Sequence, residues 1–439
     1  MQSDLRSFLA GAGARGLVSR PDGAVSLMEI PERMEAAGRE GKIFLAEQVE
    51  GFEAPLVYNL LGSQELLALA LGCGREDAIR RFIAAGENLI EPVLVENAPV
   101  QERVFLGDEA DVSRLPLIVH SKKDAGRYIS AGLVVAKDPD TGVQNVSFNR
   151  MQLKGARKLG IRMMPSNHLG MMQQKYEERN RPMQVAVVLG NHPCELIAAS
   201  SSPRYGIDEF TLASGLRGEA LEMTKCKTVD LAVPARAEIV IEGEVLPRVR
   251  EAEGPFGDFM GYYVPVMENH VVRVTAVTMR EGAIFQTMKA GSEEDSRLLG
   301  LSREAAVLKA VEAMGAKVRA LSLSPMIFNC AISIEQRFEG EAKNVILAAM
   351  GAYPWLKVCV VVDHDVDVFD KNDIWWAIGT RLKPETGVVQ VNNAFGLGRD
   401  PYRLHQSKLG LDCTIPLGAW DEFERITIPR PGDGIGFPV

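Results

Sequence analysis

Short apolar runs of the strand type crowd the middle of the chain. Between about residues 110 and 290 they recur as ISAGLVVAKD, MQVAVVLG, CELIAAS, AEIVIEGEVL and HVVRVTAVTM. Turn residues such as those of Asp138–Gly142 separate them. Runs of this length, rich in β-branched residues and bounded by turn formers, favour strands. Many strands at such short spacing predict an antiparallel barrel or sandwich and argue against a doubly wound sheet.

The two flanking regions alternate helical and strand-like patterns. Near the N-terminus, Ser3 is placed to cap a helix, Lys42–Ala46 has a strand pattern, and Ser63 opens a second helix. Towards the C-terminus, the strand-like AISIEQ, VCVVVD and GVVQVNN alternate with the helical EAKNVILAAMG and NDIWWAIGTRL. Such alternation predicts a C-terminal α/β layer with parallel strands.

These patterns divide the chain into four parts of an α+β multidomain protein. Residues 1–110 form an N-terminal α/β segment, and residues 111–300 form the β-rich domain. A connecting helix follows at residues 301–315, capped by Ser302 and ended by Gly315. Residues 316–439 form the C-terminal α/β domain.

Composition and charge narrow the class of protein. Of the 439 residues, 46% are hydrophobic and 24% charged, which excludes intrinsic disorder, a collagen-like chain and a coiled coil. The net charge of −9 disfavours nucleic acid as the main partner, because an acidic surface repels phosphates. Small acidic ligands stay possible, since a local basic pocket can override the net charge.

Cysteine usage and hydropathy indicate a cytoplasmic protein. The six cysteines are scattered, without a C-x-x-C pair, as is typical of buried thiols in a reducing compartment. The first residues carry charges where a signal peptide needs an apolar core, and no apolar run approaches the roughly 20 residues that span a bilayer.

Three motifs have plain structural explanations. Gly11–Gly16 matches G-x-G-x-x-G, but it follows a helix and not a strand, which indicates a helix-terminating turn. Asp363–Asp367 resembles the start of a calcium loop but lacks the later glycine and glutamate. His192–Glu195 lacks a spacing that would bring metal ligands together and is interpreted as a turn that enters a strand.

The segment Glu253–Tyr263 is the most unusual stretch. Two carboxylates, Glu253 and Asp258, flank a Gly-Pro-x-Gly turn that would let the backbone approach a flat or crowded group. Paired acids are suited to proton transfer, because their mutual repulsion raises one pKa. From these residues alone, a surface turn is the favoured interpretation and a site stays an alternative.

Three stretches together resemble the UbiD family of prenylated-flavin-dependent decarboxylases, the 3-octaprenyl-4-hydroxybenzoate carboxy-lyase type. They are Asn145–Gln152, Arg162–His168 and Glu253–Tyr263, and Asp208–Glu209 and Ser407–Thr414 support them. The match runs from about residue 40 to residue 417. The order and spacing of the stretches make it specific.

The resemblance implies prenylated FMN, bound through its phosphate to Mn²⁺ (or Mg²⁺), with K⁺ nearby. By resemblance the metal ligands are Asn145, His168 and Glu209, and oxygen and nitrogen ligands of this kind suit these metals better than a structural zinc site. The residues that the resemblance places around the cofactor are Asn145, Phe148, Asn149, Arg150, Arg162, Met163, Met164, Asn167, His168, Glu209 and Lys408.

The implied activity is reversible, non-oxidative decarboxylation through a covalent adduct with prenylated FMN, which acts as the electron sink. The catalytic residues carried over are Arg150, Glu253 and Asp258, with Asp258 as the proton donor. Many family members have glutamate at the position of Asp258, and the shorter side chain changes the proton's path. Cys413 stands where alanine is common.

The resemblance also implies the surroundings of the site. The β-rich region becomes a split β-barrel of the flavin-reductase type, and the C-terminal domain supports a homodimer or higher homo-oligomer. Partners are an aromatic, heteroaromatic or α,β-unsaturated carboxylic acid, CO₂, and a flavin prenyltransferase that supplies the cofactor. Arg297 could pair with a second substrate carboxylate or simply be solvated. The alternatives are a non-decarboxylating flavin-binding protein and a silent subunit of a multi-component carboxylase.

Overall fold

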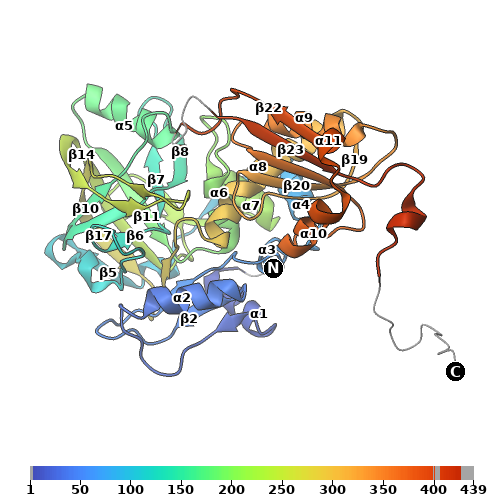
Figure 1. The fold of residues 1–439 in the computed structure, drawn as a ribbon. Helices are drawn as coiled ribbons and strands as arrows, with labels where there is room; N and C mark the ends of the chain where they lie inside the picture. The colour runs from blue at the N-terminus through green and yellow to red at the C-terminus, as the bar shows by residue number, and fades with distance from the viewer. Residues whose placement is uncertain (1–2, 399, 401–405, 427–439) are drawn as a thin grey trace. The chain divides into compact units, whose positions relative to one another are not determined.

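The computed structural model describes residues 3–398, 400 and 406–426 (Figure 1). The chain divides into two compact units. Unit 1 is Met1–Ala305 with Pro325–Ile327, and unit 2 is Ala306–Ser324 with Phe328–Val439. The four-part division expected from the sequence is finer than this and stays a prediction.

A nine-stranded antiparallel sheet dominates unit 1 (Figure 1). Its order is β6-β9-β10-β17-β14-β11-β7-β8, with β5 paired to β17. The strands are β5 (Arg103–Leu106), β6 (Tyr128–Ile129), β7 (Leu133–Lys137), β8 (Gln144–Phe148), β9 (Met151–Gly155), β10 (Lys158–Ile161), β11 (Met183–Leu189), β14 (Ile239–Glu253) and β17 (Met267–Met279).

The antiparallel arrangement of this region is confirmed, because every pairing in the sheet is antiparallel. A barrel is not shown: among the described residues, no pairing joins β6 to β8. The central strand β11 is buried at all positions but one, as expected for a strand covered on both faces.

The N-terminal part of unit 1 is the α/β segment that the sequence predicts. Its four-stranded sheet has the order β1-β2-β3-β18, so a strand from much later in the chain completes it. Ser63 caps α3 by accepting the amide of Leu66, as predicted, whereas α1 is capped by Asp4 and not by Ser3. The elements are α1 (Leu5–Gly13), β1 (Val18–Ser19), α2 (Ile30–Arg39), β2 (Ile43–Ala46), β3 (Leu56–Tyr58), α3 (Gln64–Leu71), α4 (Ala78–Glu87) and β18 (Phe285–Thr287).

Smaller elements connect these sheets. A three-stranded sheet has the order β13-β12-β4, and β15 and β16 form a two-stranded hairpin. The elements are β4 (Val93–Leu94), β12 (Glu222–Lys225), β13 (Ala232–Pro234), β15 (Phe256–Gly257), β16 (Tyr263–Val264), α5 (His168–Glu178), α6 (Pro193–Ser200), α7 (Glu209–Arg217) and the 3₁₀ turns Pro99–Gln101, Gly107–Glu109 and Val112–Arg114.

Two further sequence predictions in unit 1 are wrong. CELIAAS forms helix α6 and not a strand, with His192 as its N-cap through Nδ1, which accepts the amide of Cys194. Every residue of α6 is buried, so no polar face marked the helical period. Ser302 caps nothing, because α8 (Glu293–Ala313) begins nine residues before it with three acidic residues in its first turn.

Unit 2 contains a five-stranded mixed sheet of order β19-β20-β21-β23-β22. The predicted strands AISIEQ and VCVVVD are the parallel neighbours β20 and β21, and the third inner strand, β23, is parallel to β21 but was not predicted. GVVQVNN is a strand, but as β22 it lies antiparallel at the edge. The elements are β19 (Lys317–Ser322), β20 (Asn329–Glu335), α9 (Glu341–Ala352), β21 (Val358–Asp363), α10 (Lys371–Arg381), α11 (Pro384–Gly387), β22 (Val388–Val391), β23 (Lys408–Cys413) and the 3₁₀ turn Trp420–Phe423.

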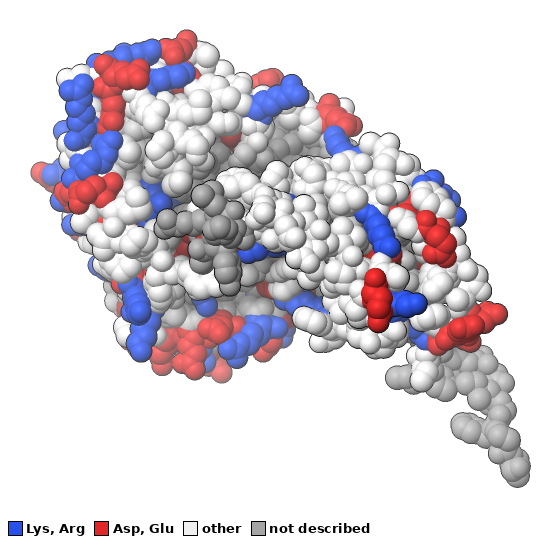
Figure 2. Space-filling model, turned by 45° about the horizontal axis from the view of Figure 1, so that its top comes forward, with Lys and Arg blue, Asp and Glu red and all other residues white. Residues whose placement is uncertain are grey.

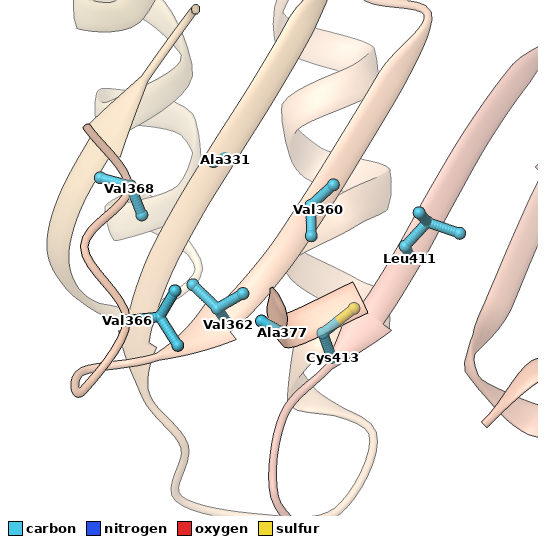
Figure 3. Close-up of a cluster of buried hydrophobic side chains, with 8 residues drawn as sticks. All are labelled: Ala331, Val360, Val362, Val366, Val368, Ala377, Leu411 and Cys413. Carbon is cyan, nitrogen blue, oxygen red and sulfur yellow. The ribbon is translucent and has the colours of Figure 1, made fainter. Parts of the chain in front are cut away.

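Helices cover both faces of this sheet. A Cβ on Gly410 would clash with Ile346 of α9, while its neighbour Leu411 packs with Ala377 of α10 on the other face. Cys413 belongs to the α10 side, so its departure from the family's alanine is accommodated inside the core (Figure 3). The cluster comprises Ala331, Val360, Val362, Val366, Val368, Ala377, Leu411 and Cys413 (Figure 3).

The surface drawn in Figure 2 carries basic and acidic side chains next to one another, so neither sign of charge covers that face. All six cysteines are free thiols. Among the described residues, none of the helices is both long and apolar enough to cross a membrane.

Candidate active site

A buried ion pair joins two of the three predicted catalytic residues. Arg150 lies between β8 and β9, and Glu253 ends β14. The Nε of Arg150 donates to Oε1 of Glu253 at 3.0 Å and Nη2 donates to Oε2 at 2.8 Å. The side chains are 10% and 0% exposed, respectively. Two parallel charge-assisted bonds of this kind fix both orientation and charge.

Two further side chains complete this network. Asn269 on β17 donates its Nδ2 to Oε2 of Glu253 at 2.7 Å. The guanidinium of Arg150 lies 4.6 Å from the ring centroid of Phe256, a cation–π distance. Phe256 in turn lies 4.6 Å, centroid to centroid, from the buried ring of Tyr128. Glu253 therefore sits in a polar cage closed by aromatic rings.

The third predicted catalytic residue, Asp258, lies on the hairpin that follows Glu253. Its amide donates to the carbonyl of Tyr262, and the amide of Gly261 donates to the carbonyl of Asp258, each at 2.9 Å. Asp258 is partly buried. Since Phe256 contacts Arg150, the short hairpin that carries Asp258 also touches the ion pair.

A loop from far earlier in the chain anchors this hairpin. Asp124 accepts the amide of Gly257 at 2.8 Å and that of Ser121 at 2.9 Å, and Ala125 donates to the carbonyl of Pro255 at 3.0 Å. Burial raises the pKa of Asp124. A Cβ on Gly257 would lie 2.7 Å from Oγ of Ser121, so a larger residue there would displace that side chain.

One predicted metal ligand, Glu209, begins α7 and is bonded to the strand that carries another, Asn145. Glu209, only 2% exposed, accepts the amide of Val146 at 2.6 Å, and Val146 follows the buried Asn145 on β8. Burial raises the pKa of Glu209 to about 8. A buried carboxylate is an oxygen donor of the kind that hard divalent cations prefer.

The third predicted ligand, His168, begins α5. Its ring meets the ring of Tyr205 edge to face, with centroids 5.0 Å apart, and the Tyr205 hydroxyl donates to Asp138. Helix α5 packs on β8, the strand of Asn145 (Figure 1). Within the described part of the chain, no group of three or more His, Cys, Asp or Glu residues could hold a metal ion. The predicted metal set, which includes an amide, stays a prediction.

The predicted flavin-lining residues fall on two adjoining stretches. Asn149 donates its Nδ2 to the carbonyl of Arg162 at 2.9 Å, which joins the end of β8 to the end of β10. Nη1 of Arg162 lies 3.0 Å from Sδ of Met267. The remaining members of the two stretches are Phe148, which ends β8, the buried Met163, the exposed Met164, and Asn167, the N-cap of α5.

Two predicted residues have structural partners elsewhere. Lys408 lies on β23 in unit 2, where its ammonium donates to the carbonyls of Pro354 at 2.6 Å and Leu356 at 2.9 Å. Burial lowers the pKa of Lys408. Arg297 on α8 donates to Oε1 of Gln64 at 2.7 Å. A role for Lys408 towards the flavin stays a prediction.

Sequence reasoning missed Asn269 and Asp124. Asn269 lies opposite Glu251 in the antiparallel register of β14 and β17, so only that register brings it to Glu253. Asp124 precedes Gly257 by more than a hundred residues. A pairing prediction for β14 and β17 would have found the first, and nothing in the local pattern marks the second.

Comparison with protein families gives three consecutive matches. Residues 14–85 match the 3-octaprenyl-4-hydroxybenzoate carboxy-lyase N-terminal domain, residues 92–293 its Rift-related domain, and residues 296–413 its C-terminal domain. Together they take in most of the chain.

Individual relatives match over nearly the full length. An anhydromevalonate phosphate decarboxylase from Methanothermobacter thermautotrophicus is 34% identical over 429 residues, covering 96% of this chain and 99% of the relative. The solved structure of the UbiD-class enzyme HmfF from Pelotomaculum thermopropionicum in complex with FMN is 40% identical, with a TM-score of 0.91 and 97% coverage of both chains.

A more distant solved structure has the same fold. The apo 3,4-dihydroxybenzoic acid decarboxylase from Enterobacter cloacae is 28% identical, with a TM-score of 0.89, and the match covers 98% of this chain and 97% of that one. The α+β multidomain fold is therefore confirmed. The three family matches and the full-length relatives agree with the buried Arg150–Glu253 pair: the chain belongs to the UbiD family, and it is a carboxy-lyase.

Proposed function

We propose that this protein catalyses the reversible, non-oxidative decarboxylation of an aromatic, heteroaromatic or α,β-unsaturated carboxylic acid, with prenylated FMN as cofactor. The observation that carries the proposal is the buried Arg150–Glu253 pair beside the Asp258 hairpin. Flavin binding alone would not require a buried carboxylate–guanidinium pair with a second acid on the hairpin that contacts it. HmfF structures with FMN and with prenylated FMN support the choice of cofactor.

In this proposal the ion pair controls where charge resides. Arg150 and Asn269 hold the carboxylate of Glu253 with three hydrogen bonds, which keeps its orientation constant during turnover. Arg150 presents a fixed positive charge to a carboxylate substrate. The hairpin from Phe256 to Asp258 rests on that guanidinium, so the acid is positioned relative to it.

Asp258 is the proton donor. Loss of CO₂ leaves an electron pair on carbon, and the Asp258 carboxylic acid supplies the proton that forms the new C–H bond. The anchoring of this hairpin by Asp124 limits its movement. Prenylated FMN, when bound, supplies the electron sink that decarboxylation at an sp² carbon needs.

The cofactor would be held through its phosphate by Mn²⁺ (or Mg²⁺) on Asn145, His168 and Glu209, with K⁺ nearby. The burial of Glu209 without a basic side chain on its carboxylate, among the described residues, supports a cation there. Phe148, Asn149 and Arg162 would line the flavin from the two joined stretches. Lys408 is the remaining candidate contact.

The substrate is proposed as a class. The relatives act on different acids: anhydromevalonate phosphate in one group, 3,4-dihydroxybenzoic and vanillic acids in others. What these acids share is a carboxylate on or next to an sp² carbon. An acid of this type would meet Arg150 with its carboxylate and Asp258 with the carbon that loses CO₂.

The surrounding architecture is proposed along the same lines. The nine-stranded sheet of unit 1 would be the split β-barrel that binds the flavin, within residues 111–300. Along the chain, the N-terminal segment precedes this domain, and the connecting helix and the C-terminal domain follow it. The protein would act in the cytoplasm as a homo-oligomer, with a flavin prenyltransferase supplying the cofactor. An evolved dimeric form of HmfF supports an oligomer, and light scattering of the purified protein would measure its mass.

The experiment is anaerobic purification after co-expression with a flavin prenyltransferase. Cofactor mass, absorbance spectrum and manganese content would be measured first. CO₂ release would then be assayed from anhydromevalonate phosphate, 3,4-dihydroxybenzoate, vanillate, furan-2-carboxylate and cinnamate. Prenylated FMN with turnover of at least one acid is expected. Plain FMN, or prenylated FMN without turnover of any acid, would support the flavin-binding or silent-subunit alternative.

The matched variant is Asp258→Asn. It keeps the size of the side chain and removes the transferable proton, so turnover should fall by about 10²–10⁴-fold. The absorbance and stoichiometry of the bound flavin should stay as in the wild type. Turnover within a few-fold of wild type would remove Asp258 from the role of proton donor.

A further inference from the structure

A second buried acid lies beside the Asp258 hairpin. Asp295, in the first turn of α8, is 8% exposed. Its Oδ2 accepts the amide of Gly291 at 2.7 Å, and its own amide donates to Oγ of Ser292 at 3.2 Å. The carboxyl is therefore folded back against the loop that precedes the helix.

That loop contacts the hairpin through its backbone. Gly291 has a φ of +76°, and a Cβ there would lie 2.9 Å from the carbonyl oxygen of Phe259, the residue after Asp258. Glycine is thus required at this contact. The same amide that holds Asp295 belongs to the residue that touches Phe259, so the two acids are near neighbours. Burial, together with the charge of Asp258, raises the pKa of Asp295 to about 6.

We propose that Asp295 is the residue that returns a proton to Asp258 after each turnover. This inference rests on the proposed function, in which Asp258 gives its proton to the substrate carbon. The Asp258 carboxylate then takes the proton of the Asp295 carboxylic acid, and Asp295 takes a proton from water. Each cycle consumes one proton from solvent and releases one CO₂, so charge and atoms balance.

The position of Asp295 suits this transfer at both ends. On one side it adjoins the hairpin that carries Asp258. On the other side it is hydrogen-bonded to Gly291, which is exposed, and Ser292, which is partly exposed, so the residues that hold it are themselves open to water. An acid whose pKa lies near neutral pH both donates and recovers a proton readily.

The adjacent acid Glu294 provides a control. It is 0% exposed, and its carboxylate accepts the amides of Asn59 at 3.1 Å and Leu60 at 2.8 Å. Those bonds tie it to the N-terminal sheet region and not to the hairpin. Glu294→Gln therefore changes a buried acid one residue away without removing the proposed relay.

The test separates the first turnover from the later ones. Holoenzyme of Asp295→Asn is mixed rapidly with whichever acid of the panel gives CO₂, and product is followed over time. The resting holoenzyme equilibrates with solvent before mixing, so the first turnover does not need the relay and should stay within about twofold of wild type. The steady-state rate should fall by about tenfold or more, which gives a burst of one product per active site.

Two further variants serve as controls. Asp295→Glu should restore most of the steady-state rate, and Glu294→Gln should show no burst. Equal losses in the first and later turnovers would assign Asp295 a structural role and overturn the relay, as would an unchanged steady state. Wild-type holoenzyme that turns over no acid would instead refute the proposed function, so the two failures are distinguishable.

Discussion

Glu253 and Glu294 are the same residue type with the same burial, yet their environments are opposite. Both are 0% exposed and both belong to unit 1. Glu253 receives two bonds from the Arg150 guanidinium and one from Asn269. Glu294 receives backbone amides from Asn59 and Leu60. Burial raises the pKa of Glu294 to about 8.

The difference shows that the partners of a buried carboxyl, and not its burial, decide its chemistry. A guanidinium carries a full positive charge that compensates the cost of removing a carboxylate from water. Backbone amides carry only partial charges and compensate less. Glu253 is thus suited to carry charge in a reaction, whereas Glu294 is suited to join a helix start to the strands of the N-terminal segment.

The largest effect is expected from Glu253→Gln. A glutamine keeps the shape but leaves the buried Arg150 without a counter-charge, so the free energy of unfolding should fall by about 3–5 kcal/mol. Turnover should fall at least about 100-fold. Urea denaturation and CO₂ release would measure both. The control is Glu244→Gln, whose partner Arg273 is 62% exposed, where about 0–1 kcal/mol is expected. Similar losses in the two variants would contradict the comparison.

A smaller, pH-dependent effect is expected from Glu294→Gln. Because the folded-state pKa is about 8 and the ordinary value is 4.5, the folded protein holds this proton more tightly than the unfolded chain. Its contribution to stability is therefore complete below about pH 4.5 and is lost as the pH rises through about 8, on the order of a few kcal/mol.

The measurement is urea denaturation of both proteins at pH 5, 6.5 and 8. Relative to the wild type, Glu294→Gln should gain stability steadily as the pH rises, since glutamine does not titrate. Other buried acids contribute equally to both proteins and cancel in the difference. A difference that does not change between pH 5 and pH 8 would show that Glu294 is ionised in the folded protein like a surface acid.

The smallest effect is expected from Asn269→Ala. The variant removes one of the three hydrogen bonds to Glu253 and leaves both bonds from Arg150. The free energy of unfolding, measured by urea denaturation, should therefore fall by about 1–3 kcal/mol. Asn269→Asp should be worse than Asn269→Ala, because it places a second negative charge beside Glu253. The reverse order would mean that the cage around Glu253 tolerates additional negative charge.

Much of the fold could be read from residue patterns, with identifiable exceptions. The antiparallel β-rich middle and the alternating C-terminal part were both predicted, because periodicity is a local property. Helix α6 was missed because all eight of its residues are buried, which removes the polar face. The start of α8 was missed because its first turn, Glu293 to Asp295, is acidic and reads as a surface loop. In the structure two of these three acids are buried.

The site residues also fall into two groups, those that the sequence could mark and those that only the tertiary structure brings in. Glu253 and Asp258 stand five residues apart around a Gly-Pro turn, so the sequence could mark them as a pair. The resemblance to the UbiD family added Arg150, and the structure brings its guanidinium onto Glu253. Asn269, Asp124 and Asp295 carry no comparable local signal. Asn269 reaches Glu253 through the strand register, Asp124 reaches the hairpin from more than a hundred residues earlier, and Asp295 reaches it through the contact of Gly291 with Phe259.

Local order along the chain was thus enough for element types, the family and the central pair of acids, because these depend on neighbours in sequence. The tertiary structure decided which buried acid has a cation for a partner and which has backbone amides. It also decided which loops hold the Asp258 hairpin. The physical reason is that desolvation and Coulomb energies depend on distances in space, which residue order leaves open until the sheets pair.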